Sequence, residues 1–163
     1  MARRSGGYAM AKRISGEDTS GVRARSRRKT LARIMRVAEQ AFAESGFAGA
    51  SMAEIAASAG LAKANVLYYF RTKENLYRAV LDEILKLWLA ATDEIRDDND
   101  PKLAITAYIK AKMAYSRQRP YASKVFANEV LHGAPYLRTH FAGPMRKLVD
   151  QKSAVIEGWI ASG

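Results

Sequence analysis

Apolar residues recur at intervals of three and four positions through most of this chain, and this spacing is the feature that most restricts its fold. The first apolar stripe, after Lys29, consists of Leu31, Ile34, Val37, Ala38, Ala41 and Phe42. We find no convincing alternation of apolar and polar residues of the kind that marks a β-strand. The sequence therefore predicts an all-α fold.

Glycine and capping residues divide the first part of this periodic region into short helices. The first helix is expected to run from Lys29 to Gly46, because glycine commonly follows a helix C-terminus. The run Ser51-Met52-Ala53-Glu54 is a capping-box pattern, which begins a short second helix that Gly60 ends. A third short helix is expected from about Lys63 to Phe70.

Longer helices are expected after residue 70. Thr72 caps a fourth helix that fades at Asp97, and Pro101 opens a fifth helix that Pro120 ends. The inner side of the fifth helix is predicted to carry Leu103, Ile105, Tyr108, Ile109, Met113 and the stem of Lys112. A sixth helix is expected from Tyr121 to Leu131, and a last helical stretch is expected to break at Gly143-Pro144.

The positive charge of the chain is concentrated near its start. The net charge of the 163 residues is +11, and residues 1–29 hold nine basic and two acidic side chains. Residues 1–28 contain few large apolar residues, so we predict a disordered basic arm there. Such an arm favours a polyanionic partner, nucleic acid before membrane, although a solvated tail that aids solubility is an equal alternative.

Several classes of protein are disfavoured by what the sequence lacks. It has no cysteine, which excludes disulfide scaffolds, thiolate catalysis and cysteine-based zinc sites. His132 and His140 are eight residues apart, and the acidic turn at 97–100 lacks the pattern of a calcium loop. We therefore expect no enzyme activity, no catalytic residue, no metal and no cofactor. No apolar run is long enough for a membrane span and no signal peptide is evident, so a cytoplasmic protein is expected.

Two short helices joined by a glycine turn, with a longer helix before them, describe a helix-turn-helix over about residues 51–70. The second short helix must bury one face on its neighbours and present the other to base edges and phosphates. This motif predicts sequence-specific binding of double-stranded DNA.

The residues of this region resemble the DNA-binding domain of the TetR family. The resemblance is carried by Gly46-Phe47-Ala48-Gly49-Ala50-Ser51, Glu54-Ile55-Ala56, Ala59-Gly60-Leu61, Lys63, Tyr68-Tyr69-Phe70 and Lys73-Glu74-Asn75-Leu76. It implies a DNA-binding domain over residues 29–75 and a helical effector-binding and dimerisation domain over residues 76–163. Two departures, Ala62 before the lysine of the third helix and Leu67 within it, leave the contact set open.

The resemblance also implies which residues meet DNA: Ser51, Lys63, Ala64, Asn65, Tyr68, Tyr69 and Lys73. Lysine can reach guanine or phosphate, asparagine can pair with adenine, and alanine can offer only an apolar contact. Tyr69 is expected to hydrogen-bond to a backbone phosphate. Tyr68 is expected to pack inside the domain, although either tyrosine could do so. Each of two residues has an alternative role without DNA contact: Ser51 as a helix cap and Lys73 as a solvated lysine.

Beyond residue 80 the chain resembles the pyrimidine-utilisation branch of the same family. The runs that carry this resemblance include Ala107-Tyr108-Ile109-Lys110, Phe126-Ala127-Asn128-Glu129, His132-Gly133-Ala134-Pro135 and Lys152-Ser153-Ala154-Val155-Ile156-Glu157-Gly158-Trp159. It implies a repressor or dual regulator that binds uracil or thymine and then leaves its operator.

The candidate effector-binding residues are aromatic side chains that could wall a planar ring and polar ones that could hydrogen-bond to it. They are Trp88, Lys112, Tyr115, Phe126, Asn128, Glu129, His132 and Trp159. Each has a structural alternative, because aromatic residues at helical spacing are commonly core and a histidine near a helix end is commonly a cap.

The resemblance implies a homodimer that binds a palindromic operator. In this family the last two helices of each chain form the four-helix bundle of the dimer. That final pair has no counterpart among the helices predicted here, so the C-terminal domain is expected to be incomplete, and dimerisation depends on whether an interface survives. The alternatives are a nonspecific basic nucleic-acid-binding protein, an inactive truncated regulator, or a TetR-type repressor of another pathway.

Overall fold

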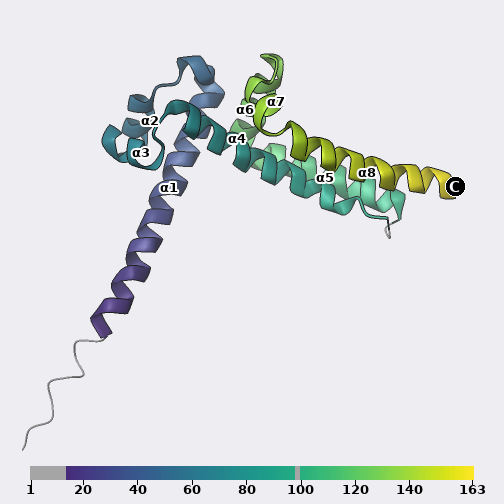
Figure 1. The fold of residues 1–163 in the computed structure, drawn as a ribbon, viewed down its shortest axis with the longest axis horizontal. Coiled ribbons are helices and arrows are strands. Elements are labelled where there is room, and N and C mark those ends of the chain that lie inside the picture. Colours follow the sequence, from purple (N-terminus) through teal and green to yellow (C-terminus); the bar gives the residue numbers. More distant parts are fainter. Residues whose placement is uncertain (1–13, 98–99) are drawn as a thin grey trace, which may run out of the picture.

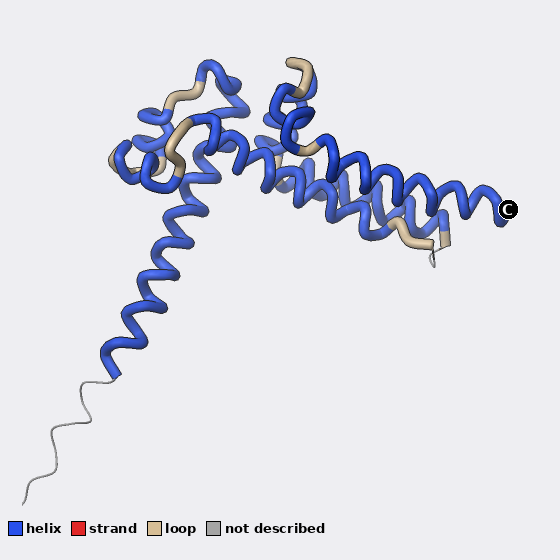
Figure 2. Tube along the Cα trace, viewed as in Figure 1, coloured by secondary structure: helices blue, strands red, loops and turns tan. Residues whose placement is uncertain are grey.

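The structure, a computed structural model, describes residues 14–97 and 100–163, with side chains from residue 21 onward. Within these ranges the chain forms helices, short turns and no strand (Figure 2), as the apolar spacing predicts. The helices are α1 (Ile14–Gly49), α2 (Met52–Ser58), α3 (Lys63–Tyr69), α4 (Lys73–Ala90), a 3-10 turn η1 (Ala91–Glu94), α5 (Pro101–Gln118), α6 (Pro120–Leu131), α7 (Pro135–His140) and α8 (Ala142–Ser162).

Three of the helix starts, those of α2, α4 and α5, are fixed by side-chain caps. Ser51 Oγ accepts a hydrogen bond from the backbone N–H of Glu54 at 3.1 Å, and Thr72 Oγ1 accepts one from Asn75 N at 3.1 Å. Asp100 does the same for α5, and Pro101 occupies its first turn. The caps predicted at residues 51 and 72 and the proline start of α5 are therefore confirmed.

α1 begins at Ile14, so the prediction that it starts at Lys29 is wrong. The predicted disordered arm is helical over residues 14–28, and its residues 1–13 lie outside the described part of the chain. Arginine and alanine, which favour helix, are frequent after Gly21, and an existing helix extends at one hydrogen bond per residue. The extension projects away from the other helices, as Figure 1 shows.

The inner side predicted for α5 is wrong for its aliphatic residues and Met113, whereas Tyr108 and Lys112 are half-buried as predicted. Leu103 and Met113 are 69% and 68% exposed, and Ile105 and Ile109 are exposed too, whereas the buried residue is Ala104. The packed face of α5 instead follows its alanines, at positions 104, 107, 111 and 114. Small side chains let this helix approach α4, α6 and η1 closely, which leaves its large apolar residues on the outside.

Two helix boundaries differ from prediction. α4 ends at Ala90 rather than near Asp97, and the break before the last helix falls at Phe141 rather than at Gly143-Pro144. Pro144 lies within the first turn of α8, where a missing backbone N–H costs no intrahelical hydrogen bond. No helix in the described part of the chain is long and apolar enough to cross a membrane.

The core lies where α1, α4 and α6 meet. Its largest fully buried side chains are Phe42, Ile34, Ile55, Leu76, Leu81, Ile84, Val66, Val80 and Val125. These residues come from α1, α2, α3, α4 and α6, so one core joins the helix-turn-helix to the helices that follow it.

A charged cluster fastens the end of α5 to this core. The Arg119 guanidinium donates to both carboxylate oxygens of buried Glu39 in α1 and, at 3.2 Å, to Glu83 in α4. The hydrogen bond to Glu39 raises the pKa of Arg119. Glu39 would lose its cation without Arg119, and a buried unpaired carboxylate is costly.

We predict that Arg119→Ala lowers the free energy of unfolding by about 1 to 2 kcal/mol, because Glu39 is buried while Arg119 is itself about one-third exposed. Urea denaturation measures this loss. Arg117→Ala, at an exposed position in the last turn of α5, is the matched control. Equal losses in the two variants would contradict a structural role for the Arg119–Glu39 pair.

Candidate nucleic-acid interface

α2 and α3 form a helix-turn-helix whose inner faces are buried against α1 and α4. Ile55, Ala56 and Ala59 of the first helix and Val66 of the second are buried. Between the helices, Gly60 has φ +61°, a left-handed conformation that a side chain would strain. The predicted motif is thus present, and the remaining surface of α3 faces outward.

The outward surface of α3 carries most of the predicted DNA-contacting residues. Lys63, Ala64 and Asn65 are exposed in its first turn. Tyr68 is 76% exposed, so the expectation that it packs inside is wrong, while Tyr69 is half-buried beside it with the ring centroids 5.5 Å apart. Both tyrosines therefore border the surface that would meet DNA.

Ser51 and Lys73 hold the motif in place. Ser51 accepts the capping bond of α2, yet its hydroxyl proton can still be donated to a phosphate. Lys73 Nζ donates to the carbonyl oxygens of Ala48 and Ala50, at 3.3 and 3.1 Å, and lies 4.6 Å from the centroid of the Phe47 ring. Lys73 is thus a structural tie between α4 and the connection from α1 to α2, rather than a solvated lysine.

Three of the predicted effector residues come together between α4, α5 and α6. The rings of Trp88 and Phe126 have centroids 4.9 Å apart, and Lys112 Nζ lies 4.7 Å from the centroid of the Trp88 ring. Lys112 Nζ also donates to the Trp88 carbonyl oxygen at 3.0 Å, and burial lowers its pKa. Trp88 Nε1 is buried and has no hydrogen-bond partner among the described residues.

Three others gather at a different place, where α6 meets the end of α1. A cavity of about 470 Å³ is lined there by Asn128, Glu129 and His132 together with Phe47 and Tyr136. His132 Nδ1 lies 2.7 Å from the Asn128 carbonyl oxygen, which is a helix-end contact. The predicted effector residues therefore form two groups rather than one.

Glu129 is occupied by internal hydrogen bonds. It is only 4% exposed, and its carboxylate accepts from Tyr77 Oη at 2.9 Å and from the backbone N–H groups of Tyr136 and Leu137 at 2.7 and 3.2 Å. Burial raises the pKa of Tyr77, and the hydrogen bond to Glu129 raises it further. This carboxylate fixes the first turn of α7 on α4.

Tyr115 and Trp159 make no hydrogen bond or aromatic ring contact with the described residues of either group. Lys152 of α8 donates to the carbonyl oxygen of Ile95 at 2.9 Å, beyond the end of α4. Trp159 follows Lys152 by seven residues, about 10 Å further along the helix axis. Its Nε1 is also buried without a partner among the described residues.

Sequence reasoning missed the aromatic cluster that surrounds Glu129. Tyr77 lies 4.9 Å from Phe42, 5.0 Å from Phe47 and 5.0 Å from Tyr136, measured between ring centroids. The only sequence signal was an aromatic residue directly after Leu76 in the apolar stripe of α4. Among the described residues, no group of three histidine, aspartate or glutamate side chains could hold a metal ion.

A helix-turn-helix that presents lysine, asparagine and tyrosine outward defines a sequence-reading DNA-binding protein. Comparison with known proteins gives the particular family. Residues 34–80 match the family described as "Bacterial regulatory proteins, tetR family", and residues 81–163 match "YcdC-like protein, C-terminal region". The chain belongs to the TetR family of transcriptional regulators, and it is not an enzyme.

Individual relatives agree with this assignment. The chain is 43% identical over 145 residues to the HTH-type transcriptional regulator RutR of Escherichia coli K12, covering 89% of this chain and 68% of that protein. It is 31% identical over 148 residues to the HTH-type transcriptional repressor NicS of Pseudomonas putida, covering 88% and 68%. The solved structure of SCO4942 from Streptomyces coelicolor, 31% identical, matches 77% of this chain and 66% of its own with a TM-score of 0.56.

We predict that Asn65→Ala reduces the ratio of affinities for specific and random DNA about tenfold, because a bidentate contact to one base supplies about 1 to 3 kcal/mol of discrimination. The ratio is measured by fluorescence anisotropy on a duplex selected from a random library and on its scrambled counterpart. Gln151→Ala, which removes an exposed amide from α8, should leave the ratio unchanged. An unchanged ratio in Asn65→Ala would exclude this residue from base reading.

Proposed function

We propose that this chain is a cytoplasmic repressor that binds a palindromic operator as a homodimer and is released by a small planar effector, a pyrimidine such as uracil or thymine. The observation that carries the proposal is the outward first turn of α3, with Lys63, Ala64 and Asn65 exposed above a buried Val66. The resemblance to the pyrimidine-utilisation branch and the relation to RutR and to the repressor NicS support the regulatory role.

In this proposal α3 enters the major groove of DNA, and residues at its end and at the starts of α2 and α4 contact the phosphates. Lys63 and Asn65 read base edges, and Ala64 contacts a thymine methyl group. Ser51, Tyr68 and Tyr69 donate hydroxyl protons to phosphate oxygens, and Lys73 adds positive charge close to the backbone while it ties α4 to the motif.

A second copy is required because a palindromic operator presents two half-sites about one helical turn apart. The C-terminal helices offer apolar surface for it. Val149, Ile156 and Ile160 of α8 and Leu103 of α5 are exposed. Exposed apolar side chains spaced along one helix support contact with a second helix.

The Trp88 cluster is the better of the two candidate effector regions. Trp88 and Phe126 offer aromatic faces for a planar ring. Trp88 Nε1 and the Lys112 ammonium are partly buried hydrogen-bond donors beside them. Carbonyl oxygens on a planar ring would satisfy such donors. Glu129, by contrast, already accepts three hydrogen bonds and has little capacity for a ligand.

The effector acts by changing the position of α4, which carries both Trp88 and Lys73. A shift of α4 at Trp88 moves Tyr77 and Lys73, and these side chains contact the connection between α1 and α2. The two recognition helices of the dimer then change their spacing. A ligand drives this change only by binding one spacing more tightly than the other.

We predict that uracil quenches the fluorescence of Trp88. The chain has two tryptophans, so Trp159→Phe leaves Trp88 as the single tryptophan, which is excited selectively at wavelengths where tyrosine does not absorb. Titration of this variant with uracil, and with adenine as a control ring, measures binding directly. We expect saturable quenching by uracil and none by adenine, and we expect the quenching by uracil to disappear when Lys112→Met is added.

The same titration is then repeated with selected duplex DNA present, and uracil is expected to weaken DNA binding at least fivefold. Saturable quenching without any effect on DNA affinity would contradict the release mechanism. No quenching would contradict the pyrimidine effector and leave a TetR-type repressor of another pathway. Equal affinity of the unliganded protein for selected and scrambled duplexes would contradict the sequence-specific function itself.

A further inference from the structure

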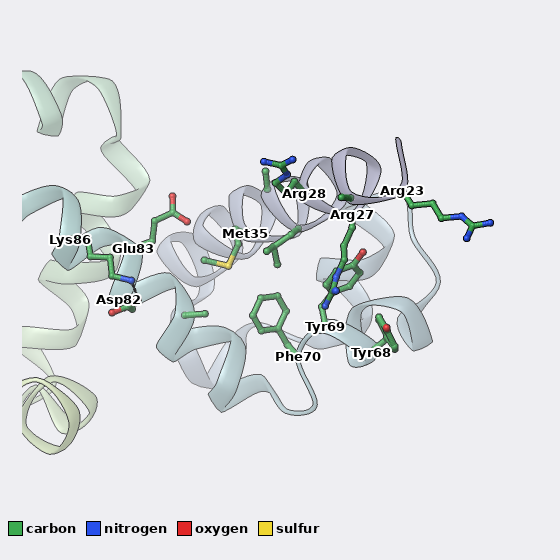
Figure 3. A pocket seen from close by; sticks show the side chains of 14 residues that line it. Arg23, Arg27, Arg28, Met35, Tyr68, Tyr69, Phe70, Asp82, Glu83 and Lys86 are labelled. Atoms are coloured by element: carbon green, nitrogen blue, oxygen red, sulfur yellow. Dashed lines mark hydrogen bonds and ion pairs between the residues drawn. The ribbon is translucent and has the colours of Figure 1, made fainter. Parts of the chain in front are cut away.

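A third cavity lies outside both effector regions, between the N-terminal half of α1 and the end of the recognition helix. It is an open groove of about 1080 Å³. Arg23, Arg27 and Arg28 line it from α1, and Tyr68 and Tyr69 line it from α3. Figure 3 shows Arg27 extending from α1 toward Tyr69, and its guanidinium carbon lies 6.0 Å from the centroid of that ring.

The groove is positively charged at the end beside α3 and carries acidic residues at the end beside α4. Residues 21–36 contain seven arginine or lysine residues and no acidic one. The opposite end of the groove is bordered by Asp82, Glu83 and Lys86 (Figure 3), where Glu83 is paired with Arg119 and Asp82 with Lys86. An anion is therefore attracted to the end beside α3 and not to the end beside α4.

The composition of the attractive end matches a sugar–phosphate backbone. Arginine donates paired hydrogen bonds to phosphate oxygens, and a tyrosine hydroxyl donates one more. The floor is apolar, formed by Ala24, Leu31 and Phe70, and can cover the non-polar face of a sugar. Tyr68 and Tyr69 belong to α3. A DNA strand that borders the major groove occupied by α3 and reaches these tyrosines therefore lies at the opening of the protein groove.

We propose that the groove between α1 and α3 is a second DNA-binding surface, which holds the sugar–phosphate backbone of the strand flanking the recognition helix. This inference rests on the proposed function and extends its contact area from α3 to the basic extension of α1. Contacts to the sugar–phosphate backbone carry no sequence information, so this surface adds affinity equally for all sequences and leaves discrimination to Lys63 and Asn65.

Two double variants with equal charge change test this assignment. Arg27 and Arg28 line the groove, whereas Arg25 and Lys29 are exposed on the other side of the same helix. We expect R27A/R28A to weaken binding of both the selected duplex and its scrambled counterpart at least tenfold. The slope of log K against log salt concentration should fall by about 2, since each lost phosphate contact removes about 0.9.

The control R25A/K29A should weaken both duplexes less than threefold. Equal effects of the two double variants would overturn the groove and indicate only long-range attraction by the helix. A change confined to the selected duplex would also overturn it, because the groove reads no sequence. If the unmodified protein does not distinguish selected from scrambled DNA, the proposed function fails, yet the difference between the two variants still tests the groove.

A crosslinking experiment gives a readout that does not depend on affinity. The chain has no cysteine, so Ala24→Cys introduces a single thiol in the groove and Ser26→Cys a single thiol on the opposite side of α1. Each thiol is coupled to a phenyl azide and irradiated with the selected 30-base-pair duplex. Crosslinks from position 24 at least fivefold above those from position 26 are expected, and equal yields or none would contradict the proposal.

Discussion

The hydrogen bond from Tyr77 to Glu129 joins the two parts of this molecule. Burial would make either group costly without a partner, and each satisfies the other at 2.9 Å. Glu129 belongs to α6 and also fixes the start of α7, while the Tyr77 ring packs on Phe42 and Phe47 beside the helix-turn-helix. The DNA-binding motif and the C-terminal helices therefore share a core, and we expect a displacement of one to displace the other.

Lys73 extends this link to the DNA-facing end. Its two hydrogen bonds to the carbonyls of residues 48 and 50 tie the first turn of α4 to the segment that precedes α2. α4 thus carries Lys73 at one end, Tyr77 a turn later and Trp88 near the other end. In the proposed mechanism α4 is the element that connects a ligand at Trp88 with the segment before α2.

The helical fold and the exposed first turn of α3 were largely predictable, because glycine stops, caps and the apolar period act locally. The caps at Ser51 and Thr72 and the exposed turn at Lys63 follow from neighbours in sequence. The inner face of α5 was not predictable in this way, since close helix packing selected Ala104 over Leu103. Glu129 was predicted as a ligand contact, because no sequence signal indicates that Tyr77, 52 residues earlier, reaches its carboxylate.

Hydrogen exchange in Glu129→Ala tests the coupling between the two parts most directly. The variant removes a carboxylate from α6, and its effect is read at backbone amides beside the helix-turn-helix, at the end of α1 and in α4. One of them is Ala50 N, which bonds to the carbonyl of Gly46. Exchange at residues 45–50 and 76–79 is expected to accelerate at least tenfold, while α8 amides stay unchanged. Acceleration confined to α6 and α7 would contradict the coupling and would mean that the two parts pack together without transmitting a change.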